Sequence, residues 1–463
     1  MPLERTESLC PVCLRTIAAE YRREGDFVIL HKKCPDHGEF SAPAWKIYGS
    51  GPDFSAWCSG KRKPAYPARP ARQIAHGCPH DCGLCPDHEQ HTCVGLIEVT
   101  SRCSLGCPVC YAQATAAGGE GGDPSAEEIS GMLDALLAAS GPCHVQFSGG
   151  EPTERSDLPE LVRLAKEKGF PLIQVNTNGL RLGREEGYAR QLKNAGLDSV
   201  YLQFDGVDDK IYAKLRGRAL LGVKLAALDA CKSAGLGVVL VCTLVRGIND
   251  GNVGAMLDFA VRSGAMVRGM HFQPVSSFGR FPWSMDNAPR ITLPELMRLI
   301  EEQTGGRIKA SHFHPPSCEH PLCSFSAVFT RSGDGLLPEA PSSCCCGSRK
   351  GSAGVLDNAE GSRISRAFTA AHWRSPEKAP EAPANDFDLF LARFSMEKRF
   401  TISAMAFQDA FNADVRRLKT CCIHVVARDG RLIPFCACNM TSQDGAPLYR
   451  KGMPSCPGTG SGR

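Results

Sequence analysis

A short loop with three closely spaced cysteines constrains this chain more than any other feature. Cys103, Cys107 and Cys110 are spaced C-x3-C-x2-C directly after the apolar run Leu96–Thr100, which predicts a β-strand. Three thiolates on one loop can bind three irons of a [4Fe–4S] cube, and no fourth cysteine follows at cluster spacing, so the fourth iron is left open. On spacing alone, a structural zinc site or a conventional ferredoxin cluster is an alternative.

A glycine-rich turn follows about forty residues later and narrows the choice. The run CHVQFSGGEPT ends a second predicted strand in Gly149, Gly150, Glu151 and Pro152. Only glycine lets a backbone approach a ligand this closely. The order strand, cysteine loop, helix, strand and GGEP turn resembles the core of the radical S-adenosylmethionine (SAM) enzymes. That order is far more specific than either motif alone.

The resemblance implies a cofactor and a set of contacts. In radical SAM enzymes the open iron chelates the amino and carboxylate groups of SAM, and reductive cleavage of SAM releases a 5′-deoxyadenosyl radical. The cysteine loop is then the catalytic cluster site, and the GGEP turn binds the methionyl end of SAM. Tyr111 supplies ring packing beside the cluster. Asn176, Thr243 and Asn249, at predicted strand ends, contact the ribose or carboxylate of SAM or serve only to cap their loops.

The middle of the chain predicts the fold class. Short apolar runs alternate with amphipathic stretches, which is typical of a parallel sheet built from βα units. Six strands are predicted: Leu96–Thr100, His144–Phe147, Leu172–Asn176, Val200–Phe204, Gly237–Thr243 and Val267–Gln273. Ser125 and Glu128 form a capping box at the start of one helix, and Gly169 ends the next. The prediction is an α/β protein with a partial (βα)6 radical SAM barrel and small cysteine-rich, metal-binding N- and C-terminal extensions.

A second C-x3-C-x2-C set lies just upstream of the barrel. Cys78, Cys82 and Cys85 follow a basic, proline-rich segment that is a poor strand, and Cys93 is available as a fourth thiolate. We therefore expect these four residues to bind a fully ligated auxiliary cluster, with a structural zinc as the alternative.

The N-terminal region contains two short metal-binding motifs. Cys10 and Cys13 form one, and Cys34 and His37 form the other, about twenty residues later across a β-rich stretch. Two such motifs resemble a rubredoxin or zinc-ribbon site for one tetrahedral metal, either zinc or mononuclear iron. The fourth ligand is His37 or Cys58, and His37 is favoured because it completes the second motif.

Many thiols remain beyond the barrel. We expect a second auxiliary [4Fe–4S] cluster to use Cys318, Cys323, Cys421 or Cys422, and Cys436, while Cys344–Cys346 add further thiols. The alternative is that several are buried free thiols, as expected for Cys143, Cys231 and Cys242 in the barrel.

These motifs divide the chain. The predicted regions are the N-terminal metal motifs (1–60), an auxiliary cluster segment (73–93), the barrel (94–280), a C-terminal cluster region (310–440) and a disordered tail (442–463), with an exposed linker at 374–386.

Composition excludes several classes of protein. The 463 residues carry a formal charge of only +4, and the basic residues are scattered except at Arg15–Arg23 and Lys61–Arg72, so nucleic acid is not an expected partner. Many of the 24 cysteines occur in C-x2-C or C-x3-C-x2-C spacings typical of metal ligands, and the polar N-terminus lacks the apolar stretch of a signal peptide. No apolar run is long enough for a membrane span. We expect a cytoplasmic, oxygen-sensitive enzyme.

The motifs taken together cover most of the chain. CPVC, CPDHGEF, GCPHDCGLCPDHEQHTC, SRCSLGCPVCYA, FSGGEPT, HPLCS and IPFCACN resemble the multi-cluster radical SAM family that includes the archaeal 7,8-dihydropterin methylase and the tetraether lipid synthases. The resemblance implies methylation or carbon–carbon bond formation on a pterin-like small molecule or a lipid. It also implies a low-potential electron donor such as ferredoxin or flavodoxin. A peptide-modifying radical SAM enzyme is the alternative.

Overall fold

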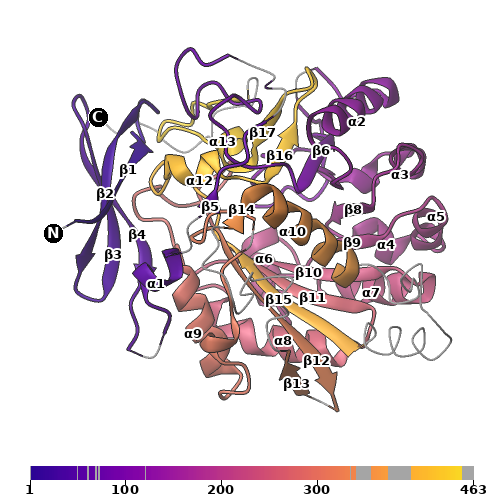
Figure 1. Ribbon diagram of the computed structural model, residues 1–463. Helices are drawn as coiled ribbons and strands as arrows, with labels where there is room; N and C mark the ends of the chain where they lie inside the picture. Colours follow the sequence, from indigo (N-terminus) through magenta and orange to yellow (C-terminus); the bar gives the residue numbers. More distant parts are fainter. Residues whose placement is uncertain are drawn as a thin grey trace, which may run out of the picture.

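A computed structural model describes residues 2–49, 51–59, 62–67, 70, 73–119, 121–316, 318–333, 335–339, 356–373 and 398–450. Within them, a large sheet of eleven strands has the order β13-β12-β15-β11-β10-β9-β8-β7-β6-β16-β17 (Figure 1). Cys344–Cys346 and the predicted linker at 374–386 lie outside the described residues.

All six predicted barrel strands are confirmed and form the parallel centre of this sheet. They are β6 (Val94–Thr100), β7 (His144–Gly149), β8 (Leu172–Thr177), β9 (Ser199–Gln203), β10 (Gly237–Leu244) and β11 (Val267–Pro274). Between them run α2 (Ala126–Ser140), α3 (Leu158–Glu167), α4 (Leu180–Arg184), α5 (Tyr188–Asn194), α6 (Asp209–Arg216), α7 (Leu221–Ala234) and α8 (Val253–Arg262). The capping box of Ser125 and Glu128 is present at the start of α2.

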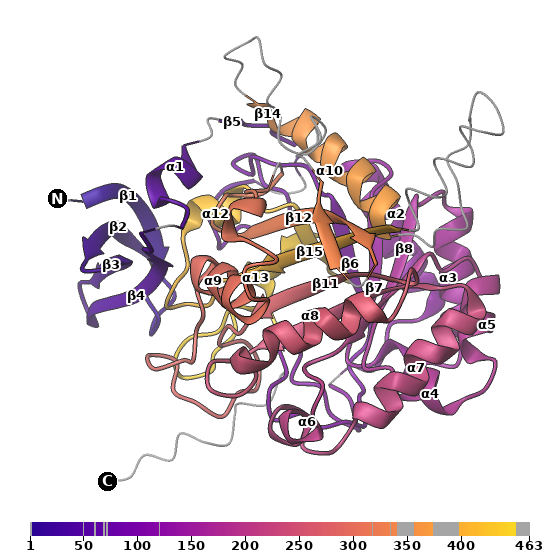
Figure 2. The same cartoon turned by 90° about the horizontal axis from the view of Figure 1, so that it is seen from below.

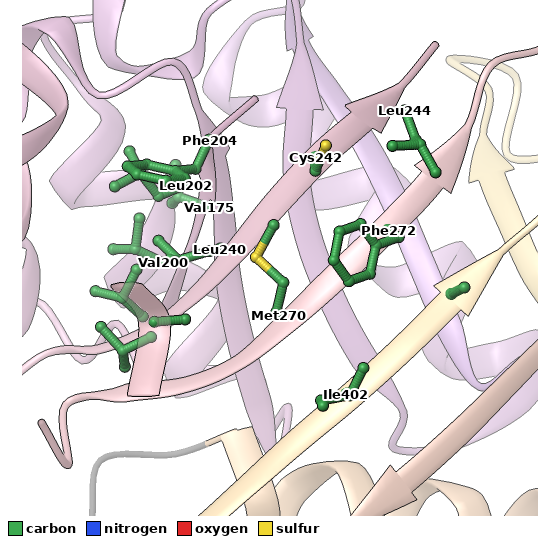
Figure 3. Close-up of a cluster of buried hydrophobic side chains, with 14 of the residues drawn as sticks. Val175, Val200, Leu202, Phe204, Leu240, Cys242, Leu244, Met270, Phe272 and Ile402 are labelled. Atoms are coloured by element: carbon green, nitrogen blue, oxygen red, sulfur yellow. The ribbon is translucent and has the colours of Figure 1, made fainter. Parts of the chain in front are cut away.

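The strand side chains alternate between a hydrophobic core and the inside of the barrel. Successive residues of a strand point to opposite faces of the sheet. Val175, Leu202, Leu240 and Phe272 are fully buried in the cluster that Figure 3 shows. Residues with the opposite parity, such as Tyr201, line the interior cavity. One face of each strand therefore stabilises the fold and leaves the other free for function.

The C-terminal region adds strands to both edges of the barrel sheet. On one side, β15 (Arg399–Met405) pairs in parallel with β11, followed by antiparallel β12 (Ser324–Ser332) and β13 (Gly335–Pro338). On the other side, β16 (Ile423–Val426) pairs in parallel with β6 and antiparallel with β17 (Leu432–Pro434). These additions cover strand edges that would otherwise be open to unwanted pairing.

Shorter elements complete the molecule. The N-terminal strands β1 (Pro2–Leu9), β2 (Thr16–Glu24), β3 (Phe27–Cys34) and β4 (Gly38–Lys46) form an antiparallel sheet beside the barrel (Figure 1). The remaining elements are α1 (Phe54–Cys58), β5 (Arg62–Lys63), η1 (Pro152–Glu154), η2 (Asp250–Asn252), α9 (Leu293–Gln303), η3 (Ala310–His312), β14 (Leu356–Asp357), α10 (Asn358–Trp373), α12 (Val415–Lys419) and α13 (Phe435–Asn439). Helix α10 lies against β10, β11 and β15 (Figure 2).

Residues 442–450 belong to the predicted disordered tail, but the structure packs them against the barrel. Residues up to 450 are ordered: the Tyr449 hydroxyl donates to the Pro79 carbonyl at 2.5 Å, and the Arg450 guanidinium forms an ion pair with Glu98. These contacts hold the segment against the barrel, which the polar composition of the tail did not predict. Residues 451–463 lie outside the described part of the chain. No helix in that described part is long and apolar enough to cross a membrane.

Candidate active site

The candidate active site is a cavity of about 280 Å³ inside the barrel. Its lining includes the C-terminal ends of several strands, where parallel βα barrels bind their ligands. The wall brings the two core motifs together with polar residues from successive strands: Cys103, Cys107, Cys110, Gly149, Gly150, Glu151, Gln146, Ser148, Asn176, Gln203, Thr243 and Gln273.

Burial sets the chemistry of the cysteine loop. Cys107 is buried, while Cys103 and Cys110 are half-buried. Burial raises the pKa of the Cys103 thiol to about 12 and also raises the pKa of Cys107. Such thiols stay protonated at neutral pH unless a cation binds them, because metal binding and deprotonation are coupled. The loop therefore fits a bound metal cluster better than a free nucleophilic cysteine.

The glycine-rich turn packs directly on the backbone that leads into the cysteine loop. The Gly150 amide donates to the Thr100 carbonyl at 2.7 Å, and the Glu151 amide donates to the Arg102 carbonyl at 2.8 Å. A β-carbon on Gly150 would lie 2.2 Å from the Arg102 oxygen, and one on Gly149 would lie 2.2 Å from the Thr100 oxygen. Any side chain at either glycine would therefore push the turn and the loop apart.

Glu151 joins the turn to the end of β8. Its buried carboxylate accepts hydrogen bonds from the Thr177 hydroxyl at 2.7 Å and the Asn178 amide at 2.6 Å. It also accepts from the Thr153 amide at 3.1 Å. Burial raises the pKa of the Glu151 carboxyl. The Asn178 side chain in turn lies 3.9 Å from the Cys103 sulfur, so one network links the turn, β8 and the cysteine loop.

The sequence patterns did not single out Arg216, yet this residue organises the cavity wall. It lies at the end of α6 and pairs with Asp205 through two hydrogen bonds of 2.7 and 2.8 Å, with both side chains buried. It also donates to the Val109 carbonyl and the Thr243 hydroxyl, each at 2.9 Å. Arg216 thus ties the cysteine loop to the ends of β9 and β10. The available signal was the Arg-Gly pair that ends the helix after YLQFDG.

A second missed feature is the segment that follows β11. Arg280 and Cys110 exchange backbone hydrogen bonds of 2.9 Å, and the Arg280 guanidinium donates to the Cys107 carbonyl at 2.7 Å. Gly279 has a φ of +59°, and a β-carbon there would lie 2.4 Å from the Tyr111 oxygen. This segment therefore holds the second and third cysteines of the loop in place.

The remaining predicted SAM contacts divide into two groups. Tyr111 and Thr243 line the cavity, as does Asn176. The buried Tyr111 hydroxyl hydrogen-bonds with the Ser148 hydroxyl at 2.8 Å, and its ring packs on Phe435 with centroids 5.6 Å apart. The predicted ring packing of Tyr111 is therefore present in the structure.

Asn249 and Pro152 do not line the cavity. Asn249 is buried, and its amide nitrogen donates to the carbonyls of Asp205 and Thr243 at 2.9 Å each. Its amide oxygen accepts from the Val245 amide at 2.8 Å. The side chain thus ties together β-strand ends, the loop-capping alternative of the sequence prediction. Pro152 begins the short helix η1.

The N-terminal motifs meet in one compact group. Cys10, Cys13, Cys34 and His37 place their ligand atoms within 4.8 Å of one another. The His37 Nδ1 lies 3.4 Å from the Cys34 sulfur. Cys58 is not part of this group; it lies on α1, where burial raises its thiol pKa to about 12. The structure therefore favours His37 over Cys58 as the fourth ligand, in a group compact enough for one metal ion.

Cys93 corrects the predicted grouping of the auxiliary cysteines. It does not complete the set of Cys78, Cys82 and Cys85; its sulfur lies 2.8 Å from that of Cys318, in a group with Cys422. The cause is strand pairing. Cys93 and Cys422 directly precede β6 and β16, and the pairing of those strands brings the Cys93 amide to 2.8 Å from the Cys422 carbonyl. The buried Ser362 hydroxyl lies 3.2 Å from the Cys93 sulfur.

The predicted C-terminal set is divided by the same rearrangement. Cys318 and Cys422 group with Cys93 instead of with the other C-terminal cysteines. Cys323 and Cys436 lie around the buried guanidinium of Arg417. The distance from the Arg417 Nε to the Cys323 sulfur is 3.4 Å. Sequence proximity therefore did not predict which of these thiols share a site.

Cys78, Cys82 and Cys85 remain near one another on a separate surface. Together with His88 and Leu418 they line a small hollow. The Cys82 backbone amide donates to the Tyr449 hydroxyl at 2.9 Å. The Cys421 sulfur lies 3.2 Å from the Ile423 carbonyl and joins neither this set nor the Cys93 group.

Comparison with known proteins shows the family. Residues 97–260 match the model of the radical SAM superfamily, and residues 2–46 match the HMPTM N-terminal zinc ribbon domain. Over 486 aligned residues the chain is 35% identical to the 7,8-dihydro-6-hydroxymethylpterin dimethyltransferase of Methanocaldococcus jannaschii, which covers 94% of this chain and 93% of that protein. The chain belongs to the radical SAM family of that dimethyltransferase. It is therefore a radical SAM enzyme, and membership implies SAM and a [4Fe–4S] cluster as cofactors.

Other similarities are confined to part of the chain. The Fe-coproporphyrin III synthase of Methanosarcina barkeri is 39% identical over 147 residues, which are 32% of this chain and 35% of that protein. The crystal structure of Streptococcus suis SuiB bound to S-adenosylmethionine covers 46% of this chain and 47% of its own, with 15% identity and a TM-score of 0.37.

Proposed function

We propose that this protein is a radical SAM methyltransferase that acts on a 7,8-dihydropterin carrying a 6-hydroxymethyl group. The observation that carries this proposal is the extent of the match to the M. jannaschii dimethyltransferase, which includes both cysteine-rich extensions as well as the barrel. The partial match of the Fe-coproporphyrin III synthase covers only 32% of the chain. A peptide-modifying activity has less support because nothing comparable to this full-length match favours it.

The proposed roles of the core residues follow from the cavity. Cys103, Cys107 and Cys110 hold three irons of a [4Fe–4S] cluster and leave one iron open. When bound there, SAM supplies the 5′-deoxyadenosyl radical that abstracts hydrogen from the substrate. Gly149 and Gly150 form the SAM-binding turn because their backbone lies directly against the cysteine loop.

The neighbouring side chains act by positioning. Glu151 fixes the turn against the end of β8 through its hydrogen bonds to Thr177 and Asn178. Arg216 holds the third cysteine of the loop close to Thr243. Tyr111 packs beside the cluster. Pro152 begins the short helix that follows the turn, and Asn249 caps the strand ends through its hydrogen bonds to Asp205 and Val245.

The other cysteine groups are proposed as separate metal sites. Cys10, Cys13, Cys34 and His37 would hold one zinc or mononuclear iron. Cys78, Cys82 and Cys85 would hold one auxiliary cluster, and Cys93, Cys318 and Cys422 a second. Cys323, Cys421 and Cys436 are further candidate ligands. None of these cysteines lines the cavity that contains Cys103, Cys107 and Cys110, so we assign both groups to structure or electron transfer rather than to SAM binding.

The cavity favours a polar substrate over a lipid. Amide and hydroxyl side chains line its wall, among them Gln146, Asn176, Gln203 and Gln273. A hydrocarbon chain would leave the buried amide oxygen of Asn176, which has no partner among the described residues, without a hydrogen bond, at a cost of about 1–3 kcal/mol. A dihydropterin offers donors and acceptors along its edge. We therefore place the substrate in the pterin branch of the family.

The reaction needs an external reductant. Each reductive cleavage of SAM consumes one electron, so we propose a low-potential ferredoxin or flavodoxin as the donor. We propose the cytoplasm as the location. Neither nucleic acid nor a membrane is a proposed partner.

The proposal is tested by anaerobic reconstitution with iron and sulfide. The protein is incubated with SAM, dithionite and 6-hydroxymethyl-7,8-dihydropterin, and 5′-deoxyadenosine and methylated pterin are measured by mass spectrometry. Both products are expected. A variant with Cys103, Cys107 and Cys110 all changed to Ala should form neither while keeping iron at its other sites. SAM cleavage without any methylated pterin would refute the substrate, and the same variant cleaving SAM would refute the cluster assignment.

A further inference from the structure

The end of the cavity farthest from the cysteine loop has an aromatic wall. Tyr201 on β9, His271 on β11 and Trp373 at the end of α10 all line the cavity. The Tyr201 ring centroid lies 5.2 Å from that of Trp373 and 5.9 Å from that of His271. His372 directly precedes Trp373, and its backbone carbonyl accepts a hydrogen bond from the Arg268 side chain at the start of β11. Trp373 therefore enters the barrel from the N-terminal ends of the strands.

Two buried polar atoms beside this wall lack hydrogen-bond partners within the described residues. They are the amide oxygen of Asn176 and the indole nitrogen of Trp373. Both residues line the cavity. Buried polar atoms are almost always paired, so two such atoms at one cavity indicate a ligand that pairs with them. One is an acceptor and the other is a donor.

The orientation of the Asn176 amide follows from its neighbours. Its amide nitrogen faces the Ser148 hydroxyl at 3.3 Å and the Gln146 amide oxygen at 3.5 Å. Gln146 in turn donates to Gln174 at 3.1 Å, and Gln174 donates to Ser199 at 2.7 Å. This chain of amides engages the nitrogen of Asn176 and directs its oxygen away from them.

The inner end of the cavity carries no formal charge. His271 hydrogen-bonds through Nδ1 to the Ser403 hydroxyl at 2.8 Å, and burial lowers the pKa of its imidazole to about 4, so the ring is neutral. The charged residues of the cavity wall, Glu151 and Arg216, pair with protein groups near the cysteine loop. The inner end therefore suits an uncharged planar ligand.

We infer that Asn176, Tyr201, His271 and Trp373 form the substrate-recognition subsite, which binds the pyrimidinone ring of a dihydropterin. The Asn176 oxygen accepts from an N–H of the ring edge, the Trp373 indole N–H donates to a ring nitrogen or carbonyl oxygen, and the aromatic wall packs on the ring face. This inference rests on the proposed function and deepens it. It assigns Asn176 to substrate binding, where the sequence predicted a SAM contact.

Equilibrium binding to the full reconstituted chain tests the subsite. The dissociation constants of 6-hydroxymethyl-7,8-dihydropterin and of SAM are measured anaerobically without reductant, by equilibrium dialysis. Asn176→Leu removes the acceptor and should weaken dihydropterin binding at least about tenfold, because a donor of the ligand is left unpaired. Trp373→Phe keeps an aromatic ring and should weaken it about 3- to 10-fold. SAM affinity should change less than about twofold in both.

Trp45→Phe is the matched control. The Trp45 indole donates to the Pro52 carbonyl at 3.1 Å in the N-terminal region, far in the chain from the cavity, so dihydropterin affinity should not change. General misfolding would reduce SAM and dihydropterin binding together, and the Trp373 variant provides a second reading if the Asn176 variant misfolds.

Three outcomes would overturn the inference. If both variants bind dihydropterin as the unchanged protein does, the proposed function stands and the subsite is wrong. If Asn176→Leu weakens SAM but not dihydropterin binding, Asn176 is a SAM contact. If the unchanged protein cleaves SAM but binds no dihydropterin, the proposed substrate fails and the subsite fails with it.

Discussion

The close contact between the glycine-rich turn and the cysteine loop makes Gly150→Ala a sharp perturbation. The added β-carbon would lie 2.2 Å from the Arg102 carbonyl oxygen and 2.9 Å from the Ser101 carbonyl carbon. A carbon and an oxygen in ordinary contact are more than about 3 Å apart, so the two segments must separate by about 1 Å. Arg102 directly precedes Cys103, and the displacement therefore reaches the first cysteine of the loop.

The size of the effect follows from two contributions. Overpacking of a close contact costs about 1–3 kcal/mol. The separation also strains two backbone hydrogen bonds, from Gly150 to Thr100 and from Glu151 to Arg102, and each contributes about 1 kcal/mol. The free energy of unfolding should fall by about 2–5 kcal/mol, a large part of the stability of a typical domain.

Gly131→Ala is the matched control because the chemical change is identical. Gly131 lies in α2 and is exposed, and a β-carbon there would have no neighbour within 4 Å. Alanine is a better helix former than glycine, so this variant should gain about 0.5–1 kcal/mol.

Urea unfolding of the anaerobically purified variants, followed by circular dichroism, measures both values. Iron content and SAM cleavage after reconstitution report on the cysteine loop, and Gly150→Ala should lower both. The reasoning is refuted if Gly150→Ala unfolds within about 0.5 kcal/mol of the unchanged protein and retains its iron and SAM cleavage.

Three further predictions concern other groups. Cys93→Ala and Cys318→Ala should each lose the same metal, so the double variant should lose no more than either single variant in elemental analysis; additive losses would show two sites. Glu151→Gln should weaken SAM binding measured by dialysis while leaving total iron unchanged, because the carboxylate contacts the turn and β8 rather than a cysteine; unchanged SAM affinity would make the turn purely structural. Burial lowers the pKa of Lys224 to about 8 in the folded state. Above pH 8 the unfolded lysine keeps a proton that the folded one loses, so this residue makes stability rise by up to about 1.4 kcal/mol per pH unit between pH 8 and about 10. Urea titrations should show that rise relative to Lys224→Met, and parallel pH curves would contradict it.

The barrel strands and helices could be predicted because each is specified by residues that are close together in the sequence. Each of the six strands is a short apolar run between amphipathic helices, and the capping box of Ser125 and Glu128 is present. The cysteine loop and the GGEP turn follow strands that are adjacent in the sheet, so their chain order already places them together. A stretch of about 50 residues, from Cys103 to Pro152, therefore contained enough information to predict this part of the site.

The grouping of the other cysteines depends on contacts that no local pattern contains. The β15 segment, Arg399–Met405, has no βα context in the sequence, yet it pairs with β11 inside the main sheet. Cys93 and Cys422 are more than 300 positions apart and meet only because β16 pairs with β6. Arg216 likewise acts through Asp205, on another element. These contacts arise from the assembled sheet and are invisible to spacing.

The corrected grouping also separates the two proposed auxiliary sites in space. Cys93 precedes β6 and Cys103 follows it, so the seven residues of that strand place the two cysteines about 20 Å apart, at opposite ends of the strand. Cys82 lies instead in a hydrophobic cluster with Phe435, whose ring packs on Tyr111 beside the cysteine loop. A cluster at Cys78, Cys82 and Cys85 therefore has packed contact with the catalytic cavity. The Cys93 group instead lies where β6 pairs with β16 and where Ser362 of α10 contacts the Cys93 sulfur, so a metal bound there would link these three elements.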